Sequence, residues 1–256
     1  MLSEITPLVL TFNEAPNIRR TLEKLTWAQN ILVLDSFSTD ETLQIVRSFP
    51  QARVAQRPFD SFAGQCNFGL AQITTGWVLS LDADYVLSDE LIEEIKSLKP
   101  PASVAGYSAR FKYCVCGRPL RASLYPPRTV LYRRELAQYR DEGHGHRVQV
   151  QGAVAALRGF IFHDDRKSLD RWIDGQKRYA RLEAQHLLAA PNAELNLADR
   201  LRKCIVAAPF LVLLDTLFAK GLILDGWPGW FYVFQRTFAE ILLSLRLIER
   251  KLKLDA

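Results

Sequence analysis

Short apolar runs alternate with helical periods over the first hundred residues of the chain. Residues 5–12, 30–35 and 77–82 are apolar and are bounded by polar turn residues, which is the pattern of strands buried on both faces. Between these runs, apolar side chains recur at helical spacing, as at Phe62, Cys66, Leu70 and Ile73. Strands that alternate with helices in this way predict a parallel α/β sheet.

One of these helices carries a start signal. Ser38 and Glu41 have the S-x-x-E spacing of a capping box, and Leu43, Val46 and Phe49 follow at helical spacing. We therefore expect a helix to open directly after the second strand.

The pattern changes in the middle of the chain and again after residue 165. Residues 107–113, 129–133, 147–151 and 158–163 are strand-like, which predicts that the sheet becomes mixed. From residue 168 onward we expect helices only, over 168–188, over 197–218 with a break or kink at Pro209, and over 230–252. In the first of these helices, Leu169, Trp172, Ile173, Tyr179 and Leu182 form the expected inward face. The sequence thus predicts an α/β domain over 1–165 and an all-helical extension over 166–256.

Composition narrows the class of protein. The chain has 256 residues, of which 48% are hydrophobic and 24% charged, so it can bury a core, and a disordered chain is excluded. Its four cysteines are too few for a disulfide scaffold and indicate reduced thiols. Residues 204–214 form the longest uncharged apolar stretch, well short of the roughly 20 residues of a spanning helix. The first residues lack the pattern of a secretory signal, so we expect a cytoplasmic protein.

The net charge of +5 is unevenly distributed. Residues 1–165 hold 18 basic and 18 acidic side chains, whereas residues 166–256 hold 15 and 10. Such asymmetry indicates an anionic partner, either nucleic acid or anionic lipid, and its alternative is a solvated basic face. Because the aromatic side chains lie in apolar segments rather than along a basic stripe, we expect no nucleic acid.

Polar and acidic residues follow three of the predicted strands. They are Thr11-Phe12-Asn13-Glu14, Asp35-Ser36-Phe37-Ser38-Thr39-Asp40 and Asp82-Ala83-Asp84. In open α/β sheets the ligand lies beyond the carboxyl ends of the strands, so these ends point to one crevice. No glycine-rich phosphate loop is present, and carboxylates would repel a phosphate unless a cation intervened. Asp82 and Asp84 can reach one Mg²⁺ or Mn²⁺, which indicates a metal-bridged nucleoside diphosphate.

Together these motifs resemble a known family. Thr11-Phe-Asn-Glu14, the run from Asp35 to Thr42, Gln65-x-Asn67 and Leu81-Asp-Ala-Asp84 are similar in order and spacing to the inverting glycosyltransferases of family 2. The resemblance covers residues 4–165 and implies the GT-A fold, an α/β fold with a mixed sheet flanked by helices. The later runs 163–172 and 177–184 resemble a bacterial branch that includes the beta-1,4-glucosyltransferases of the lipopolysaccharide inner core.

The resemblance implies roles for particular residues. Thr11, Asn13 and Glu14 would line the nucleotide site, Asp35 would contact the uracil or ribose, and Gln65 and Asn67 would face the nucleotide. Asp82 would approach the ribose or the metal, and Asp84 would be the principal metal ligand, with Mg²⁺ or Mn²⁺ as cofactor. For Gln65 and Asn67, the alternative is ordinary polar helix surface.

An inverting transferase also needs a base for the acceptor hydroxyl. The branch usually carries it in a His-Glu pair, and here the segment reads Asp141-Glu142-Gly143-His144-Gly145-His146, with no Glu after either His. Glu142 is our first choice for the base and Asp141 the second, followed by His144 or His146. The alternative is that the histidines belong to the loop or help to hold the metal or the diphosphate.

Three other motifs have competing interpretations. His163-Asp164-Asp165-Arg166 is either a strand-to-helix junction near the diphosphate or the acidic start of a helix. Arg128 and Arg133 could bind phosphate or an acidic acceptor, or act as surface ion partners. Cys114 and Cys116 lack a second pair at zinc spacing and are interpreted as strand cysteines.

The last ninety residues carry a cluster of aromatic side chains, namely Trp227, Trp230, Phe231, Tyr232 and Phe234. Aromatic residues flanked by Arg and Lys are typical of a membrane interface. The alternatives are a helical subdomain that packs on the catalytic domain and an interface of a homo-oligomer.

These observations lead to one expected function. It is metal-dependent transfer of a sugar from a nucleotide sugar, with a UDP-sugar as the expected donor, to a lipid-linked saccharide such as lipopolysaccharide core. We expect the protein to lie peripherally on the inner face of the plasma membrane. The alternatives are transfer to polyprenyl phosphate and a non-catalytic, membrane-bound nucleotide-sugar-binding protein. The sequence leaves the sugar, the nucleotide and the acceptor open.

Overall fold

A computed structural model describes residues 2–122, 126–142, 145–191, 193 and 195–253, with the backbone only at 141, 142 and 145–147. The chain divides into two compact units. The first, here the α/β unit, comprises Met1–Pro119 and Ser123–Arg166, and the second, here the helical unit, comprises Leu120–Ala122 and Lys167–Ala256. The functions expected of residues 1–165 and 166–256 stay predictions.

The α/β unit is built on one mixed sheet of nine strands with a separate two-stranded hairpin, β9–β10. The path through the sheet is β3-β2-β1-β4-β8-β6-β11-β5, and β7 pairs with β6. The strands are β1 (Ile5–Thr11), β2 (Ile31–Asp35), β3 (Ala52–Gln56), β4 (Trp77–Asp82), β5 (Tyr85–Leu87), β6 (Val104–Val115), β7 (Arg118–Pro119), β8 (Arg128–Arg133), β9 (Ala137–Glu142), β10 (Gly145–Val150) and β11 (Ala153–His163).

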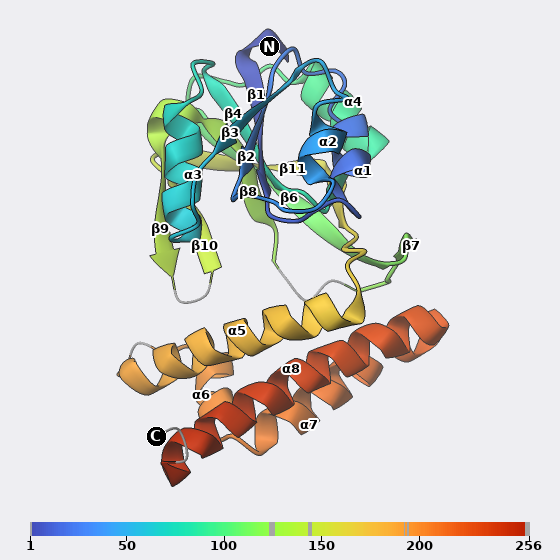
Figure 1. Cartoon of the computed structure of the whole chain (residues 1–256), viewed down its shortest axis with the longest axis vertical. Coiled ribbons are helices and arrows are strands. Elements are labelled where there is room, and N and C mark those ends of the chain that lie inside the picture. The colour runs from blue at the N-terminus through green and yellow to red at the C-terminus, as the bar shows by residue number, and fades with distance from the viewer. Residues whose placement is uncertain (1, 123–125, 143–144, 192, 194, 254–256) are drawn as a thin grey trace. The chain divides into compact units, whose positions relative to one another are not determined.

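Helices cover both faces of this sheet. Helix α3 (Phe62–Ala71) and the β9–β10 hairpin lie on one face, and α1 (Ile18–Glu23), α2 (Thr42–Val46) and α4 (Asp89–Ser97) lie on the other (Figure 1). Short 3₁₀ turns span Leu2–Glu4 and Arg134–Leu136. Apolar side chains of β1, β2, β4 and α3 form a buried core, which includes Leu8, Leu32, Leu34, Cys66, Leu70 and Val78. The predicted mixed sheet flanked by helices is confirmed.

The register of the sheet aligns the ends of its central strands. Strand β1 is parallel to both neighbours, with Thr11 beside Asp35 of β2 and Leu10 beside Asp82 of β4. The carboxyl ends of the three strands therefore meet at one edge, as the sequence predicts.

The predicted capping box is wrong. Helix α2 begins at Thr42, and Glu41, its N-cap residue, makes no side-chain capping bond. The hydroxyl of Ser38 instead donates to Asp35 and accepts from the amide of Asn13. Ser38 thus stabilises the loop after β2 and does not cap α2, because its hydroxyl hydrogen-bonds to a carboxylate in that loop.

The helical unit contains four α-helices among its described residues. They are α5 (Leu169–Ala189), α6 (Leu197–Lys203), α7 (Ala207–Leu214) and α8 (Gly226–Leu252), with a π-helical turn over Asp215–Ala219 and a 3₁₀ turn over Leu222–Asp225. Helix α8 packs against both α5 and α7 (Figure 1). Its buried side chains join Ala184, Leu187 and Leu195 in a small core.

Two expectations for these helices need correction. The break between α6 and α7 lies at Ile205, whose φ is 59°, and not at Pro209, which occupies the first turn of α7. Pro228 likewise lies in the first turn of α8, which begins at Gly226 and not at the expected residue 230. A proline in the first turn breaks no helical hydrogen bond, because the amides there have no partner in the helix.

The inward face expected of α5 is wrong in part, since Trp172 and Ile173 are half-buried but the other members are not. Leu169, Tyr179 and Leu182 are exposed, whereas Ala180, Ala184 and Leu187 are buried. The small alanine side chains face the interior, since they allow a neighbouring helix to approach α5 closely.

A buried ion cluster links three helices of this unit. Arg202 of α6 donates to Glu240 of α8, with Nη2 3.0 Å from Oε1, and to Glu183 of α5 at 3.3 Å. Both glutamates are buried. The cluster compensates charges that would otherwise be costly to remove from water.

Candidate active site

The candidate site lies where the order of strands changes direction. From β1 the chain adds β2 and β3 on one side, and then returns to add β4 on the other side. Such a switch point leaves a crevice beyond the carboxyl ends of the strands, where ligands of open α/β sheets bind. Thr11, Asp35 and Asp82 end the three strands there.

Asp35 is fully buried and engaged on both carboxylate oxygens. Thr11 Oγ1 donates to Oδ1 at 3.0 Å, and the Ser38 amide and Gln56 Nε2 donate to Oδ2 at 2.9 and 3.0 Å. The side chain therefore ties β1, β3 and the loop after β2 together. Its predicted contact with uracil or ribose stays a prediction.

The loops after β1 and β2 are cross-linked through Asn13 and Glu14. Asn13 Oδ1 accepts from the Thr39 amide at 2.7 Å, and the Glu14 amide donates to Thr42 Oγ1 at 2.7 Å. Asn13 has a φ of 55°, a left-handed conformation that asparagine tolerates better than most residues. The Glu14 carboxylate accepts from Asn17 Nδ2 at 2.8 Å. These polar residues give the edge of the crevice a defined shape.

Two phenylalanines at this edge are missed by sequence reasoning. Phe12 is 55% exposed and Phe37 is 51% exposed, each on one of the two cross-linked loops. Phe37 has a φ of 62°, which is costly for a bulky residue. The sequence signal for them is an aromatic residue placed between polar residues directly after a strand.

Gln65 and Asn67 both make internal contacts from helix α3. Gln65 is buried, and its Nε2 donates to Ser36 Oγ at 3.1 Å and to the Arg57 carbonyl at 3.0 Å. Its buried Oε1 has no hydrogen-bond partner among the described residues. Asn67 clamps the backbone of Tyr139 from both sides, with Nδ2 3.0 Å from its oxygen and Oδ1 2.9 Å from its nitrogen. Neither side chain is ordinary helix surface.

The acidic turn after β4 is held firmly in place. Thr21 Oγ1 of α1 donates to the Ala83 carbonyl at 2.7 Å, and the Asp164 amide donates to the Asp84 carbonyl at 3.1 Å. Asp84 is buried and Asp82 is half-buried. In the part of the chain that the structure describes, no hydrogen bond to the Asp82 carboxylate is found.

His163 at the end of β11 completes this cluster. Its Nε2 lies 3.0 Å from Asp84 Oδ2, and its ring contacts Tyr85 and Tyr113. Its buried Nδ1 has no partner among the described residues. Burial lowers the pKa of His163, but the carboxylates of Asp84 and Asp82 outweigh it, and the net pKa is raised.

Asp164, the next residue of the 163–166 motif, has a structural role. Asp164 is buried, and it accepts from Arg20 Nη1 at 2.6 Å and from the Gly117 amide at 2.9 Å. The side chain of His163, by contrast, reaches the carboxylate of Asp84. The sequence does not reveal this, because it does not show that β11 pairs in parallel with β6 and so ends at the same edge as β4.

The donor set suits a hard cation that is shared with a substrate. Among the described residues, no three His, Cys, Asp or Glu side chains are grouped to hold a metal ion. Asp82 and Asp84 offer carboxylate oxygens, and Mg²⁺ is commonly bound by one or two carboxylates together with substrate phosphates. The residues present therefore fit a divalent ion bridged to a diphosphate better than a cage built by the protein alone.

Three of the four candidate bases, Asp141, Glu142 and His146, lie on the β9–β10 hairpin. Asp141 and Glu142 end β9, and Asp141 is in register with His146 of β10. His144 lies outside the described residues, as do the side chains of Asp141, Glu142 and His146. Their assignment stays a prediction.

The hairpin is anchored beside the acidic turn. Tyr139 of β9 donates from its hydroxyl to Ser80 Oγ at 2.9 Å, and Ser80 precedes Asp82 by two residues on β4. Residues two apart on a strand share a face, so the hairpin is tied to the face that carries Asp82. Burial raises the pKa of the Tyr139 hydroxyl well above its usual value, which keeps it protonated as a donor.

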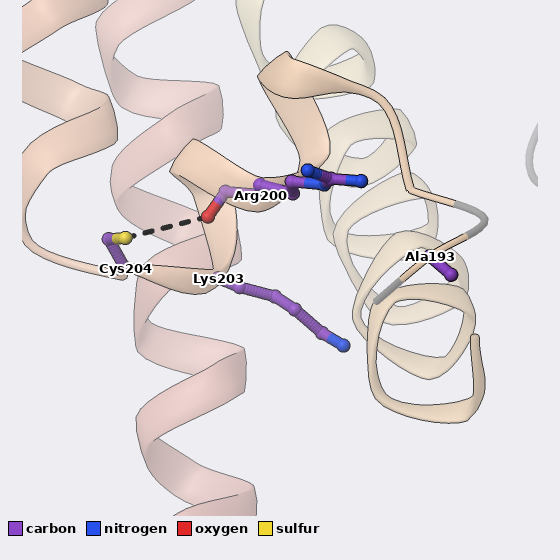
Figure 2. A pocket seen from close by; sticks show the side chains of 4 residues that line it. All are labelled: Ala193, Arg200, Lys203 and Cys204. Atoms are coloured by element: carbon purple, nitrogen blue, oxygen red, sulfur yellow. Dashed lines mark hydrogen bonds between the residues drawn. The ribbon is translucent and has the colours of Figure 1, made fainter. Parts of the chain in front are cut away.

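A second concave feature lies within the helical unit. It is an open depression of about 530 Å³ lined by Ala193, Arg200, Lys203 and Cys204, with the two basic side chains extending along it (Figure 2). The Cys204 thiol donates to the Arg200 carbonyl at 3.5 Å. Because no carboxylate of the described residues lines it, we do not place sugar transfer there.

Comparison with known proteins places the chain in a family. The model of glycosyl transferase family 2 matches residues 8–160. The lipopolysaccharide core biosynthesis glycosyltransferase LpsC of Rhizobium meliloti is 25% identical, over 96% of this chain and 92% of its own length. An uncharacterized glycosyltransferase of Rickettsia prowazekii is 24% identical, over 82% of this chain and 77% of the relative.

Solved structures show the same fold. The mannosyltransferase PcManGT from Pyrobaculum calidifontis, in complex with GDP-Man and Mn²⁺, has a TM-score of 0.56 at 18% identity, over 97% of this chain and 88% of that one. Residues 1–349 of S. aureus TarS, in complex with UDP-GlcNAc, give a TM-score of 0.50 at 16% identity, over 98% and 92%. The family match covers the strands that form the crevice, and the chain therefore belongs to glycosyl transferase family 2, as a glycosyltransferase of the GT-A fold that uses a nucleotide sugar.

Proposed function

We propose that the protein is an inverting, metal-dependent glycosyltransferase that moves a sugar from a nucleotide sugar to a lipid-linked saccharide, such as lipopolysaccharide core. The observation that carries the proposal is the cluster at the switch point of the sheet. There, buried Asp84 lies 3.0 Å from His163, beside a half-buried Asp82 whose carboxylate is available to a cation.

The donor is a nucleoside diphosphate sugar held at the edge of β1 and β2. The exposed rings of Phe12 and Phe37 suit stacking on a nucleobase, a contact worth about 1–3 kcal/mol per base in nucleic-acid complexes. A UDP-sugar is our first expectation. The structures of similar fold hold GDP-Man in one case and UDP-GlcNAc in the other, so both bases belong in the test.

Asp82 and Asp84 would hold Mg²⁺ or Mn²⁺, with His163 Nε2 hydrogen-bonded to the Asp84 carboxylate beside it. When bound, the ion neutralises charge on the leaving diphosphate, an effect worth several kcal/mol in metal-assisted catalysis. The backbone bonds from Thr21 and Asp164 keep the two carboxylates oriented without any movement of the turn. This preorganisation lowers the cost of binding.

The hairpin supplies the base. Glu142 accepts the proton of the acceptor hydroxyl as its oxygen attacks the anomeric carbon. The new carbon–oxygen bond forms on the face opposite the bond that breaks, and the nucleoside diphosphate leaves, so the configuration of the sugar inverts. The Asn67 clamp and the Tyr139–Ser80 bond orient the strand that ends in Glu142.

The choice of acceptor rests on the relative LpsC, which is named for lipopolysaccharide core biosynthesis and aligns with nearly the whole chain. The test is transfer by the purified protein with Mn²⁺, from labelled UDP- and GDP-sugars, to core-truncated lipopolysaccharide or to polyprenyl phosphate. We expect labelled lipopolysaccharide as the product, and NMR should show that the anomeric configuration of the transferred sugar is inverted. A product on polyprenyl phosphate alone would mean that polyprenyl phosphate, and not lipopolysaccharide, is the acceptor. Donor binding without turnover would indicate a non-catalytic protein.

A further inference from the structure

Helix α8 exposes a continuous apolar stripe along its whole length. Its members follow one another at alternating steps of four and three residues, and every one has at least 36% of its surface exposed: Trp227, Phe231, Phe234, Phe238, Ile241, Leu245, Ile248 and Leu252. Residues at these steps share one face of an α-helix. The helix has 27 residues, so the stripe is about 40 Å long at 1.5 Å per residue.

This stripe is not the face that α8 packs into the helical unit. The buried side chains of the helix are offset from it and include Val233, Glu240, Leu243 and Leu247. Glu240 on that buried face is held by Arg202. Helix α8 is thus apolar on two faces. One face is buried in this unit, whereas every member of the stripe stays at least 36% exposed, and the stripe meets α5 at Phe238, whose ring centroid lies 6.0 Å from that of Trp172.

Neighbouring elements add to the exposed apolar surface. The residues concerned lie on α7 and on the two turns that lead to α8, namely Phe210, Leu211, Leu214, Phe218 and Leu224. Helix α7 packs against α8, so these residues belong to the same part of the helical unit. Contiguous exposed apolar surface of this kind is typical of an interaction site.

Exposed charge around this surface is mostly basic, with Asp215 as an exposed acid in the turn after α7. Residues 197–253 contain five acidic side chains, and four of them are held in ion pairs: Asp199 and Glu240 with Arg202, Asp225 with Arg121, and Glu249 with Arg246. Exposed bases lie at both ends of the stripe, with Lys220 in the turn before α8 and Arg250, Lys251 and Lys253 at its end. This arrangement complements an anionic surface.

We propose that α7 and α8 dock in one leaflet of a bilayer that contains anionic lipid, lying in its plane with the stripe in the hydrocarbon. Among the described residues, no single helix is long and apolar enough to span a membrane, although Ala207–Ala219 and Leu222–Leu252 pass together as a pair bent by 66°. Arg236, Glu240 and Arg246 lie along the other faces of α8, where an in-plane helix keeps charged groups out of the hydrocarbon. The proposal concerns binding and does not depend on the proposed chemistry.

A second copy of the chain is the competing occupant, because a period of 3.5 residues is also that of a coiled coil. Coiled coils set partner and register with charged side chains that flank the seam. Here Gln235, Thr237, Leu242 and Ser244 flank the middle of the stripe and carry no charge. Trp227 is 85% exposed, and tryptophan is enriched where protein meets the membrane–water interface.

The experiment is flotation of the full-length protein with vesicles of phosphatidylcholine alone or with 30% phosphatidylglycerol. We expect binding to the anionic vesicles at 50 mM salt and weaker binding at 1 M salt, where charges are screened beyond about 3 Å. The variant Phe231→Ser/Phe234→Ser/Phe238→Ser should lower the partition coefficient by at least about a hundredfold. Lys251→Glu/Lys253→Glu should lower it about tenfold or more, on anionic vesicles only.

Matched controls separate the stripe from general apolar or basic surface. Leu182→Ser/Leu188→Ser removes two exposed leucines of α5, and Lys99→Glu reverses an exposed charge of the α/β unit. Both should float like wild type, and circular dichroism should show every variant folded. Absence of flotation by the wild type at low salt, or equal flotation of the stripe variant, would overturn the proposal. A dimer in sedimentation velocity that the stripe variant abolishes, without any vesicle binding, would assign the face to a second copy.

Discussion

The α/β unit and the helical unit use their polar and apolar side chains in opposite ways. At the carboxyl edge of the sheet, polar groups turn inward and bind one another, so that Asp35, Gln65 and Asp164 are buried and hydrogen-bonded. In the helical unit, apolar groups turn outward, and Trp227, Phe234 and Leu245 are more than half exposed.

This difference separates two physical tasks. Transfer chemistry needs groups fixed within a fraction of an ångström, and loops cross-linked by side-chain hydrogen bonds supply that precision. Adhesion to a fluid, non-specific surface needs apolar area and charge but little precision, and a helix face supplies both. A protein that modifies a lipid-linked acceptor has a use for each.

The largest effect should come from removing Asp84, the buried acid at the candidate metal site of the α/β unit. Asp84→Ala should lower transfer by at least about a thousandfold, because the metal site loses a carboxylate whose contribution is several kcal/mol. Asp89→Ala is the matched control, an acid that begins α4 only five residues later and is 81% exposed in its side chain. The measurement is initial rate in saturating Mn²⁺. More than a tenth of wild-type activity in Asp84→Ala would refute the role of Asp84 as a metal ligand.

Glu142→Gln should slow turnover by about 10²–10⁴-fold and leave donor affinity unchanged, because only the proton acceptor is lost. Glu135→Gln, an exposed change in the turn before β9, should behave like wild type. The measurement is kcat and the donor KM for both variants. Normal turnover of Glu142→Gln together with loss of activity in His146→Ala would move the base to the histidines.

The buried cluster of the helical unit should respond differently, through stability. Arg202→Met leaves Glu240 and Glu183 buried without their cation, a situation that costs about 3–5 kcal/mol. Lys177→Met removes an exposed partner of Asp174 on α5 and should cost less than about 1 kcal/mol. Hydrogen exchange should show faster opening of α5, α6 and α8 in the first variant only. Equal protection of these helices in both variants would mean that the cluster contributes little.

The smallest predicted effect concerns the Asn67 clamp. Asn67→Ala removes two hydrogen bonds to Tyr139, so we expect a loss of about 1–3 kcal/mol in stability and about tenfold in kcat. Asn67→Asp keeps the acceptor for the Tyr139 amide and should fall between wild type and alanine. Gln72→Ala at the exposed end of α3 is the control. If Asn67→Ala loses stability while kcat stays unchanged, the clamp does not position the hairpin.

The sequence predicts the central sheet well, because buried strands and their polar ends are local patterns. Residues 31–34 and 77–79 are apolar without interruption, and β2 and β4 form there. The short β5 and the polar β9 escape prediction, since neither has enough apolar residues to stand out. Their pairing is set by partners far along the chain, such as β11 for β5.

The residues of the candidate site fall into the same two groups, those that a local pattern reveals and those that depend on distant partners. Asp82 and Asp84 are recognisable because two acids separated by one residue follow an apolar run. His163 and the Asn67 clamp are not, because their partners lie 79 and 72 residues away in the sequence. Asn67 illustrates the limit, since the family resemblance implies a role at the nucleotide and does not reveal that its side chain binds the backbone of β9.

The central claim is that Asp82 and Asp84 bind a nucleoside diphosphate through a divalent ion. The most direct test is calorimetric titration of UDP and GDP into the wild-type protein and into Asp84→Asn, each with Mn²⁺ and with EDTA. We predict that Mn²⁺ strengthens binding to the wild type at least about tenfold and that Asp84→Asn loses this gain while keeping its fold. Equal affinity with and without Mn²⁺ in the wild type, or an undiminished gain in Asp84→Asn, would contradict the claim.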